Sequence, residues 1–111
     1  MKYVLLYETG DISKAGENFP AHEKRFKRYH TDGTLLMLGP YADPEDGAMS
    51  IFTTREAAEE FARGDPFVVN GVVSRWEVRE WNEALVPYAP LGACRPPRRS
   101  LSSSLFSFAC S

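Results

Sequence analysis

Cysteine is missing from the first 85 residues of this 111-residue chain, and both cysteines, Cys94 and Cys110, lie in the last stretch. A secreted domain of this size usually depends on disulfide bonds, so the lack of cysteine predicts a reducing compartment, the cytoplasm. Long apolar runs are missing too, because the run that starts at Met1 is interrupted at Glu8. It is too short for a signal peptide or a membrane-spanning helix, so we expect neither secretion nor membrane insertion.

Acidic side chains are absent after Glu83, so the net charge is unevenly distributed along the chain. The first 85 residues contain all 15 Asp and Glu and ten of the 13 Lys and Arg, a net charge of −5, and the rest carries +3. An acidic body argues against binding to nucleic acid, which requires a basic face. Residues 86–111 combine Arg, Pro and Ser clusters with a short apolar end. We predict that they form a disordered or non-native tail behind one domain, residues 1–85.

Motifs that would indicate several enzyme classes are also absent. The sequence has no Gly-rich phosphate loop, and two histidines without a cysteine in the body give no metal-ligand spacing. The acidic loop around Glu45 lacks the ligand pattern of a calcium site, and we expect it to be a solvated turn. Ser50 and Ser74 lack the context of a catalytic nucleophile, although either could line a pocket. The sequence thus predicts no metal and no cofactor.

Alternating strand and helix signals are what the sequence does contain. β-Branched and aromatic residues predict strands at 2–8, 35–38, 48–53 and 72–81. We expect a helix from about Pro20 to Asp32, because proline suits the first turn of a helix. A second helix follows a predicted capping box of Thr53 and Glu56, and Asp65 then caps a short turn.

This order of strands and helices predicts a ferredoxin-like βαββαβ fold of the α+β class, with a four-stranded antiparallel sheet. Both helices would cover one face of that sheet. The first strand is nevertheless apolar on both sides, with Tyr3, Leu5 and Tyr7 on one side and Val4 and Leu6 on the other. We therefore expect the second face to pack against another copy of the chain in a homodimer.

His22 is the best candidate for chemistry that the residues alone offer. It repeats with Phe26 and Tyr29 at i, i+4 and i+7, which places an ionisable ring on the apolar face of a helix. The alternative interpretation is a core histidine with one hydrogen bond, and spacing alone does not decide between them. His30 lies among charged neighbours, and a solvated or helix-terminal position is the simpler interpretation for it.

Asp65 has a simple structural interpretation, because aspartate followed by proline is a typical helix N-cap. A second interpretation depends on the fold. If Asp65 lies beside His22, its carboxylate would fix the imidazole tautomer and leave the other ring nitrogen as a base. His22 would then be a general base and Asp65 its orienting partner.

In this order the segments resemble the YciI-like (YCII-related) family of small proteins. The resemblance covers about residues 1–83 and rests on an ordered set of segments: Tyr3 to Tyr7, Pro20-Ala21-His22, Leu36 to Pro40, Asp65-Pro66-Phe67 running to Gly71-Val72, and the Trp and Val alternation of the last strand. Residues from Val86 on do not resemble the family, which agrees with an extraneous tail.

The resemblance implies a dimeric α+β barrel, in which two ferredoxin-like sheets pack face to face. It also implies a pocket beside the sheet, where His22 and Asp65 match the family's proposed His–Asp pair. We expect Gly39 and Pro40 to shape that pocket.

The family is similar to muconolactone-isomerase-like proteins and includes a dehydrochlorinase that acts on chlorinated hydroxyquinols. The expected function is therefore lyase or isomerase chemistry on a small ring compound, without a cofactor. The alternatives are a dimer that binds a small molecule without catalysis, and a structural dimer whose pocket is filled by side chains.

Overall fold

The computed structural model describes residues 1–87. Its elements are strand β1 (Lys2–Thr9), the 3-10 helix η1 (Ile12–Lys14), helix α1 (Ala15–Thr31), strands β2 (Leu35–Pro40) and β3 (Gly47–Phe52), helices α2 (Arg55–Gly64) and α3 (Pro66–Val69), and strand β4 (Val73–Trp81). No helix in this part of the chain is long and apolar enough to cross a membrane. The predicted tail falls mostly on residues 88–111, outside the described residues, and stays a prediction.

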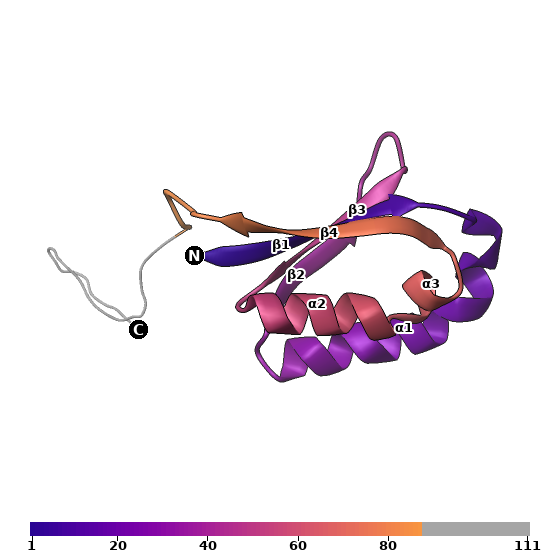
Figure 1. Ribbon diagram of the computed structural model, residues 1–111, viewed down its shortest axis with the longest axis horizontal. Coiled ribbons are helices and arrows are strands. Elements are labelled where there is room, and N and C mark those ends of the chain that lie inside the picture. The colour runs from indigo at the N-terminus through magenta and orange to yellow at the C-terminus, as the bar shows by residue number, and fades with distance from the viewer. Residues whose placement is uncertain (88–111) are drawn as a thin grey trace, which may run out of the picture.

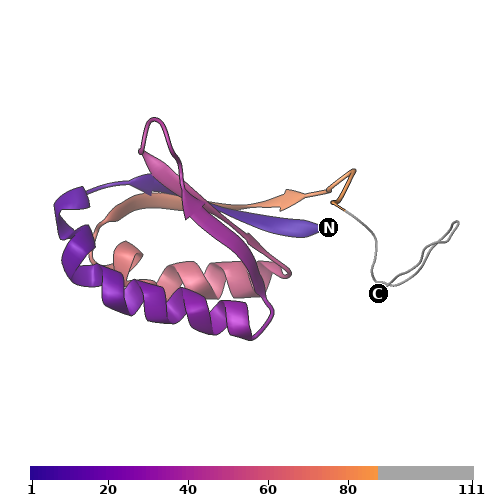
Figure 2. The same ribbon diagram turned by 180° about the vertical axis from the view of Figure 1, so that it is seen from behind.

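The four strands form one antiparallel sheet in the order β2-β3-β1-β4. β1 lies between two neighbours, which fits the apolar residues on both of its faces. Both long helices lie on the same side of the sheet, and no described helix lies on the other side (Figure 1 and Figure 2). This is the ferredoxin-like α+β fold that the sequence predicted.

The core lies between the sheet and the two long helices. Its fully buried large side chains include Leu5, Leu35, Phe52 and Phe61. Tyr29 of α1 packs edge-on against Phe52 and Phe61, with ring centroids 6.4 and 5.2 Å away. Burying a side chain of this size contributes about 1.5–3 kcal/mol, so these rings fix how α1 lies against the sheet.

The start of α1 differs from the prediction. The helix begins at Ala15 rather than near Pro20, so the proline lies inside it. The added first turn is held by Asn18, whose side-chain amide donates to the Lys14 carbonyl at 2.9 Å. The same side chain accepts a hydrogen bond at 2.8 Å from Asn70, which follows α3. Contacts with a distant segment thus extend the helix where local sequence signals are weak.

The start of α2 differs by one residue. Thr54, not Thr53, is the N-cap, and its hydroxyl oxygen accepts from the Ala57 amide at 3.1 Å. Thr53 is held elsewhere, because its amide donates to the Thr34 carbonyl at 2.9 Å. The predicted capping box is therefore wrong, since Glu56 does not occupy the third helical position after Thr54.

The end of β2 also differs, because the strand continues through Gly39 and Pro40, two residues beyond the predicted range of 35–38. Gly39 pairs with Met49, and Pro40 pairs with Ala48. β2 is an edge strand, and an edge position tolerates a proline that cannot donate to the ladder. This extension carries Gly39 and Pro40 along the sheet toward the cavity described below.

The face of the sheet away from the helices is apolar near its centre. The register places Val4 opposite Ile51 and Leu6 opposite Met49. Residues directly opposite share a face, and the alternate residues of β1 are the buried ones, so these four side chains point away from the helices. Met37 of β2 pairs with Ile51 and is 65% exposed. The second apolar face expected from the sequence is therefore present.

Candidate active site

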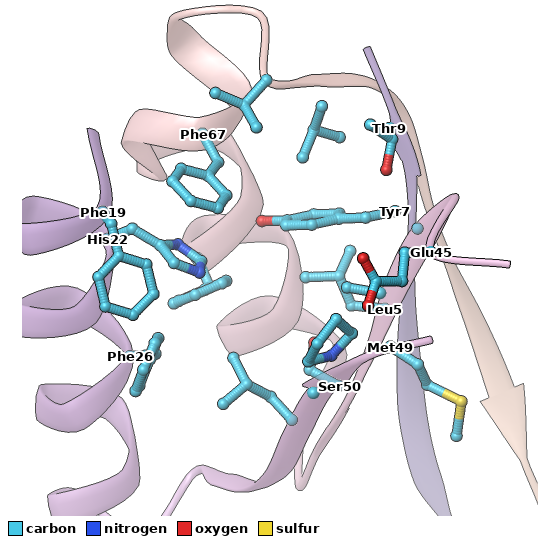
Figure 3. A pocket seen from close by; sticks show the side chains of 18 of the residues that line it. Leu5, Tyr7, Thr9, Phe19, His22, Phe26, Glu45, Met49, Ser50 and Phe67 are labelled. Carbon is cyan, nitrogen blue, oxygen red and sulfur yellow. The ribbon is translucent and has the colours of Figure 1, made fainter. Parts of the chain in front are cut away.

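A cavity of about 470 Å³ lies between the sheet, α1 and α3 (Figure 3). Its walls are mostly apolar and aromatic, and they include Leu5, Phe19, Phe26, Leu38, Phe61 and Phe67. Pockets that hold small molecules usually measure about 300–1,000 Å³ and have walls of this kind with a few polar groups. The space and its lining therefore suit one small apolar or aromatic molecule.

His22 projects from α1 into the wall of this cavity (Figure 3) and is 8% exposed. The Phe67 ring stacks on the imidazole, with centroids 3.9 Å apart and an interplanar angle of 8°. Phe26 meets the imidazole edge-on, with centroids 5.2 Å apart and an angle of 80°. The predicted helical face that joins His22 to Phe26 is present, and the two rings hold the imidazole in one orientation.

Asp65 lies where α2 ends and α3 begins, and it is completely buried. Its Oδ1 accepts a hydrogen bond from the Phe67 amide at 3.1 Å, which is the N-cap expected from the sequence. The same oxygen lies 2.7 Å from Nδ1 of His22. One carboxylate is thus both a helix cap and the hydrogen-bond partner of the histidine, so the two interpretations of Asp65 are compatible.

Tyr7 is a third member of this group, which the sequence had indicated only as part of an apolar strand. Its hydroxyl donates to Oδ2 of Asp65 at 2.6 Å, and in Figure 3 the ring extends from the sheet into the cavity. Burial, together with the Asp65 charge and this hydrogen bond, raises the pKa of the Tyr7 hydroxyl far above its usual value. Tyr7 therefore stays neutral and remains a donor. The sequence signal that could have pointed to Tyr7 is its hydroxyl, because a buried tyrosine usually requires a hydrogen-bond partner.

The Asp65 carboxylate determines which nitrogen of His22 is free. An ionised carboxylate only accepts hydrogen bonds, so Nδ1 carries the proton that joins the pair. The neutral imidazole then keeps Nε2 as an acceptor, and this nitrogen has no hydrogen-bond partner among residues 1–87. Nε2 is therefore the atom through which His22 can act on a molecule in the cavity.

The predicted pocket residues Gly39 and Pro40 both line the cavity. A Cβ added at Gly39 would meet no atom within 4 Å, so the packing of the protein does not require glycine there. Ser50 also lines the cavity, whereas Ser74 is outside it and its hydroxyl donates to the Glu8 carbonyl at 3.3 Å. Only one of the two serines considered from the sequence is therefore near the candidate site.

His30 and Glu45 are two further residues that the sequence had singled out. His30 is exposed near the end of α1, where its Nδ1 lies 2.9 Å from the Leu35 carbonyl, as the simpler interpretation expected. Glu45 lines the cavity, so the acidic loop is more than the solvated turn that was expected. Within residues 1–87, no three His, Cys, Asp or Glu side chains are grouped closely enough to hold a metal ion.

Comparison with known proteins gives a solved structure and a family. The chain is similar to the 5-chloro-2-hydroxyhydroquinone dehydrochlorinase from Burkholderia phenoliruptrix AC1100, whose structure is a complex with 2,5-dihydroxybenzoquinone. The TM-score is 0.61 and the identity is 19%, over 76% of this chain and 96% of that chain, a likeness that establishes the fold. No curated protein matches the chain. Residues 1–82 match the YCII-related domain, and because this is well over half of its length, the chain belongs to the YCII-related domain family.

Proposed function

We propose that the protein is a homodimeric enzyme that removes a proton from a small ring compound, without a cofactor, and so brings about an elimination or an isomerisation. The His22–Asp65 pair is the observation that carries this proposal. Asp65 holds the histidine in the tautomer whose Nε2 is free, beside a cavity large enough for a small ring compound. A general base must lie within hydrogen-bonding reach of its substrate and be held in one orientation. The place of His22 in the cavity wall and its hydrogen bond to Asp65 support this role.

In the proposed reaction, Nε2 of His22 takes a proton from a ring hydroxyl or from an acidic ring carbon. The electron pair of the broken bond moves into the ring, and a ring carbon takes up a proton there. In an isomerisation the imidazolium returns its proton to that carbon, and the product has the atoms of the substrate. In an elimination the protonated carbon is the one that bears the leaving group, such as chloride, which then departs with its own bonding pair as a second ring hydroxyl loses its proton, so that one proton and one chloride leave in total. The imidazolium is stabilised by the negative charge of Asp65. Gly39 and Pro40 would contact the bound ring from the end of β2.

The proposed substrate class rests on the walls of the cavity and on the neighbour of known activity. Phe19, Phe26 and Phe67 offer aromatic surfaces that suit a flat ring. The structural neighbour acts on 5-chloro-2-hydroxyhydroquinone, a ring with hydroxyl groups and a chlorine. We therefore propose a hydroxylated ring, activated by halogen or oxygen substituents.

The homodimer is proposed from the uncovered face of the sheet. Val4, Leu6 and Ile51 form an apolar centre there, and a second copy of the same sheet would cover it. The cytoplasm is the proposed compartment, because the first 85 residues contain no cysteine.

The experiment that tests the catalytic proposal compares wild type with His22→Ala. The probes are 5-chloro-2-hydroxyhydroquinone and simpler chlorinated hydroquinones, and the measurement is the rate of chloride release. We expect His22→Ala to lower this rate by at least about 100-fold, the lower end of what general-base catalysis contributes. His30→Ala is the matched control, since it removes an exposed histidine of the same helix and should leave the rate unchanged.

Equal rates for wild type and His22→Ala would rule out the base. Binding of these rings by wild type without turnover, weakened by His22→Ala, would instead support the alternative of a dimer that binds a small molecule without catalysis.

A further inference from the structure

Ser50 carries a buried hydroxyl that the rest of the protein does not use. The residue lies in β3, opposite Leu5 of β1 and Leu38 of β2, and it is 5% exposed. It lines the same cavity as His22 (Figure 3). Within residues 1–87, its Oγ makes no hydrogen bond.

A buried hydroxyl without a partner is unfavourable, and native proteins pair most such groups. Ser74 illustrates the ordinary case, because its hydroxyl lies within bonding distance of the Glu8 and Thr9 carbonyls at 3.3 and 3.4 Å. Ser50 is surrounded by apolar wall residues, where alanine would fill the position without this penalty. The hydroxyl of Ser50 is therefore available to a bound molecule.

The charges around the cavity restrict what that molecule can be. Of the described residues that line it, none is a lysine or arginine, and Glu45 is the one acidic side chain. An anionic ring would meet the charge of Glu45 without a compensating cation and would lose its own hydration on entering apolar walls. An uncharged ring with hydroxyl or carbonyl oxygens avoids both penalties.

We infer that Ser50 positions the ligand, through a hydrogen bond between its hydroxyl and an oxygen substituent of an uncharged aromatic ring whose reacting position faces His22. This inference rests on the proposed function for its ring ligand and adds a second polar contact to it. Apolar walls alone would let a flat ring turn in its own plane. Contacts at both His22 and Ser50 fix which ring atom lies next to Nε2.

Calorimetric binding of matched phenols to the full chain tests this inference. Hydroquinone, resorcinol and catechol are each compared with 4-methylphenol, in which a methyl group replaces the second hydroxyl. We expect at least one diol to bind wild type about three- to tenfold more tightly, the effect of one neutral hydrogen bond. Ser50→Ala should abolish this preference, and the control Ser74→Ala should keep it. The anion 4-hydroxybenzoate should bind wild type more weakly than that diol.

The inference is overturned if no diol binds wild type better than 4-methylphenol, if Ser50→Ala keeps the preference, or if 4-hydroxybenzoate binds most tightly. Ser50→Cys, whose thiol is a weak hydrogen-bonding group of similar size, provides an independent test if Ser50→Ala does not fold. Failure of the base proposal looks different, because turnover would then persist in His22→Ala while Ser50→Ala still abolished the preference for the diol. Loss of turnover in His22→Ala, combined with an unchanged preference in Ser50→Ala, would instead retain the base and remove only the role of Ser50.

Discussion

Removing the hydroxyl of Tyr7 should destabilise the fold, because it leaves Oδ2 of Asp65 buried without its donor. Tyr7→Phe changes no other contact of the ring, and an unsatisfied buried acceptor costs about 1–3 kcal/mol, more when it is charged. We expect a loss of this size in the free energy of unfolding measured with urea. Tyr41→Phe is the control, since Tyr41 is 37% exposed. Equal stability of Tyr7→Phe and wild type would mean that this hydrogen bond contributes nothing.

The raised pKa of the Tyr7 hydroxyl also predicts that the protein loses stability at high pH. The pKa of Tyr7 is raised in the folded protein above the ordinary value of 10.0, so above about pH 10 the unfolded chain releases a proton that the folded chain keeps. Wild type should therefore lose stability as the pH rises through this range, and Tyr7→Phe should lose less. The difference in unfolding free energy between wild type and Tyr7→Phe should therefore be smaller at about pH 11 than at about pH 9. A constant difference would contradict the raised pKa.

The residues alone suggested His22 and Asp65 separately, and the resemblance gave the reason to pair them, because no spacing rule brings together residues that are 43 positions apart. Helical periodicity alone placed His22 on a buried face, and the residue type alone made Asp65 a cap. The hydroxyl of Tyr7 signalled that a buried tyrosine would need a hydrogen-bond partner, but the sequence could not show that this partner is Asp65, 58 residues away. Ser50 was considered as a pocket residue, but its lack of a partner depends on tertiary structure.

At the level of helices, α2 offers a direct comparison of two neighbouring threonines. Thr54→Ala removes the side chain that accepts from the Ala57 amide, and loss of such a cap typically costs about 1 kcal/mol. Thr53→Ala should cost less, because Thr53 is held through its backbone amide. Thermal unfolding of the two variants measures the difference. A larger effect of Thr53→Ala would favour the cap that the sequence first indicated.

The order and type of the elements were predictable, since strand and helix patterns differ in period and Gly33 and Gly71 mark turns with positive φ. The boundaries of the helices and strands were harder to predict. Pro20 is a typical first-turn residue, and the helix starts before it, where the Asn18 side chain bonds both to the Lys14 carbonyl and to the distant Asn70. Contacts between distant segments leave no local mark in the sequence.

For the whole molecule, the proposed dimer predicts a solution mass of two chains at micromolar concentration. Met37→Lys should shift this mass toward one chain, because it places a charge on the uncovered apolar face of the sheet. Val69→Lys is a matched control: Met37 and Val69 are 65% and 66% exposed, but Val69 belongs to α3, away from that face. Analytical ultracentrifugation measures both. A wild-type mass of one chain would contradict the dimer.

The buried Asp65 carboxylate also determines when the site can form during folding. It joins Tyr7 in β1 and His22 in α1, across 58 and 43 residues of chain, while it caps α3. The two long-range hydrogen bonds cannot form until β1 and α1 have docked against Asp65, so formation of the site coincides with cooperative folding of the domain. Hydrogen exchange at the Phe67 amide, which donates to this carboxylate, should therefore follow global unfolding rather than local opening.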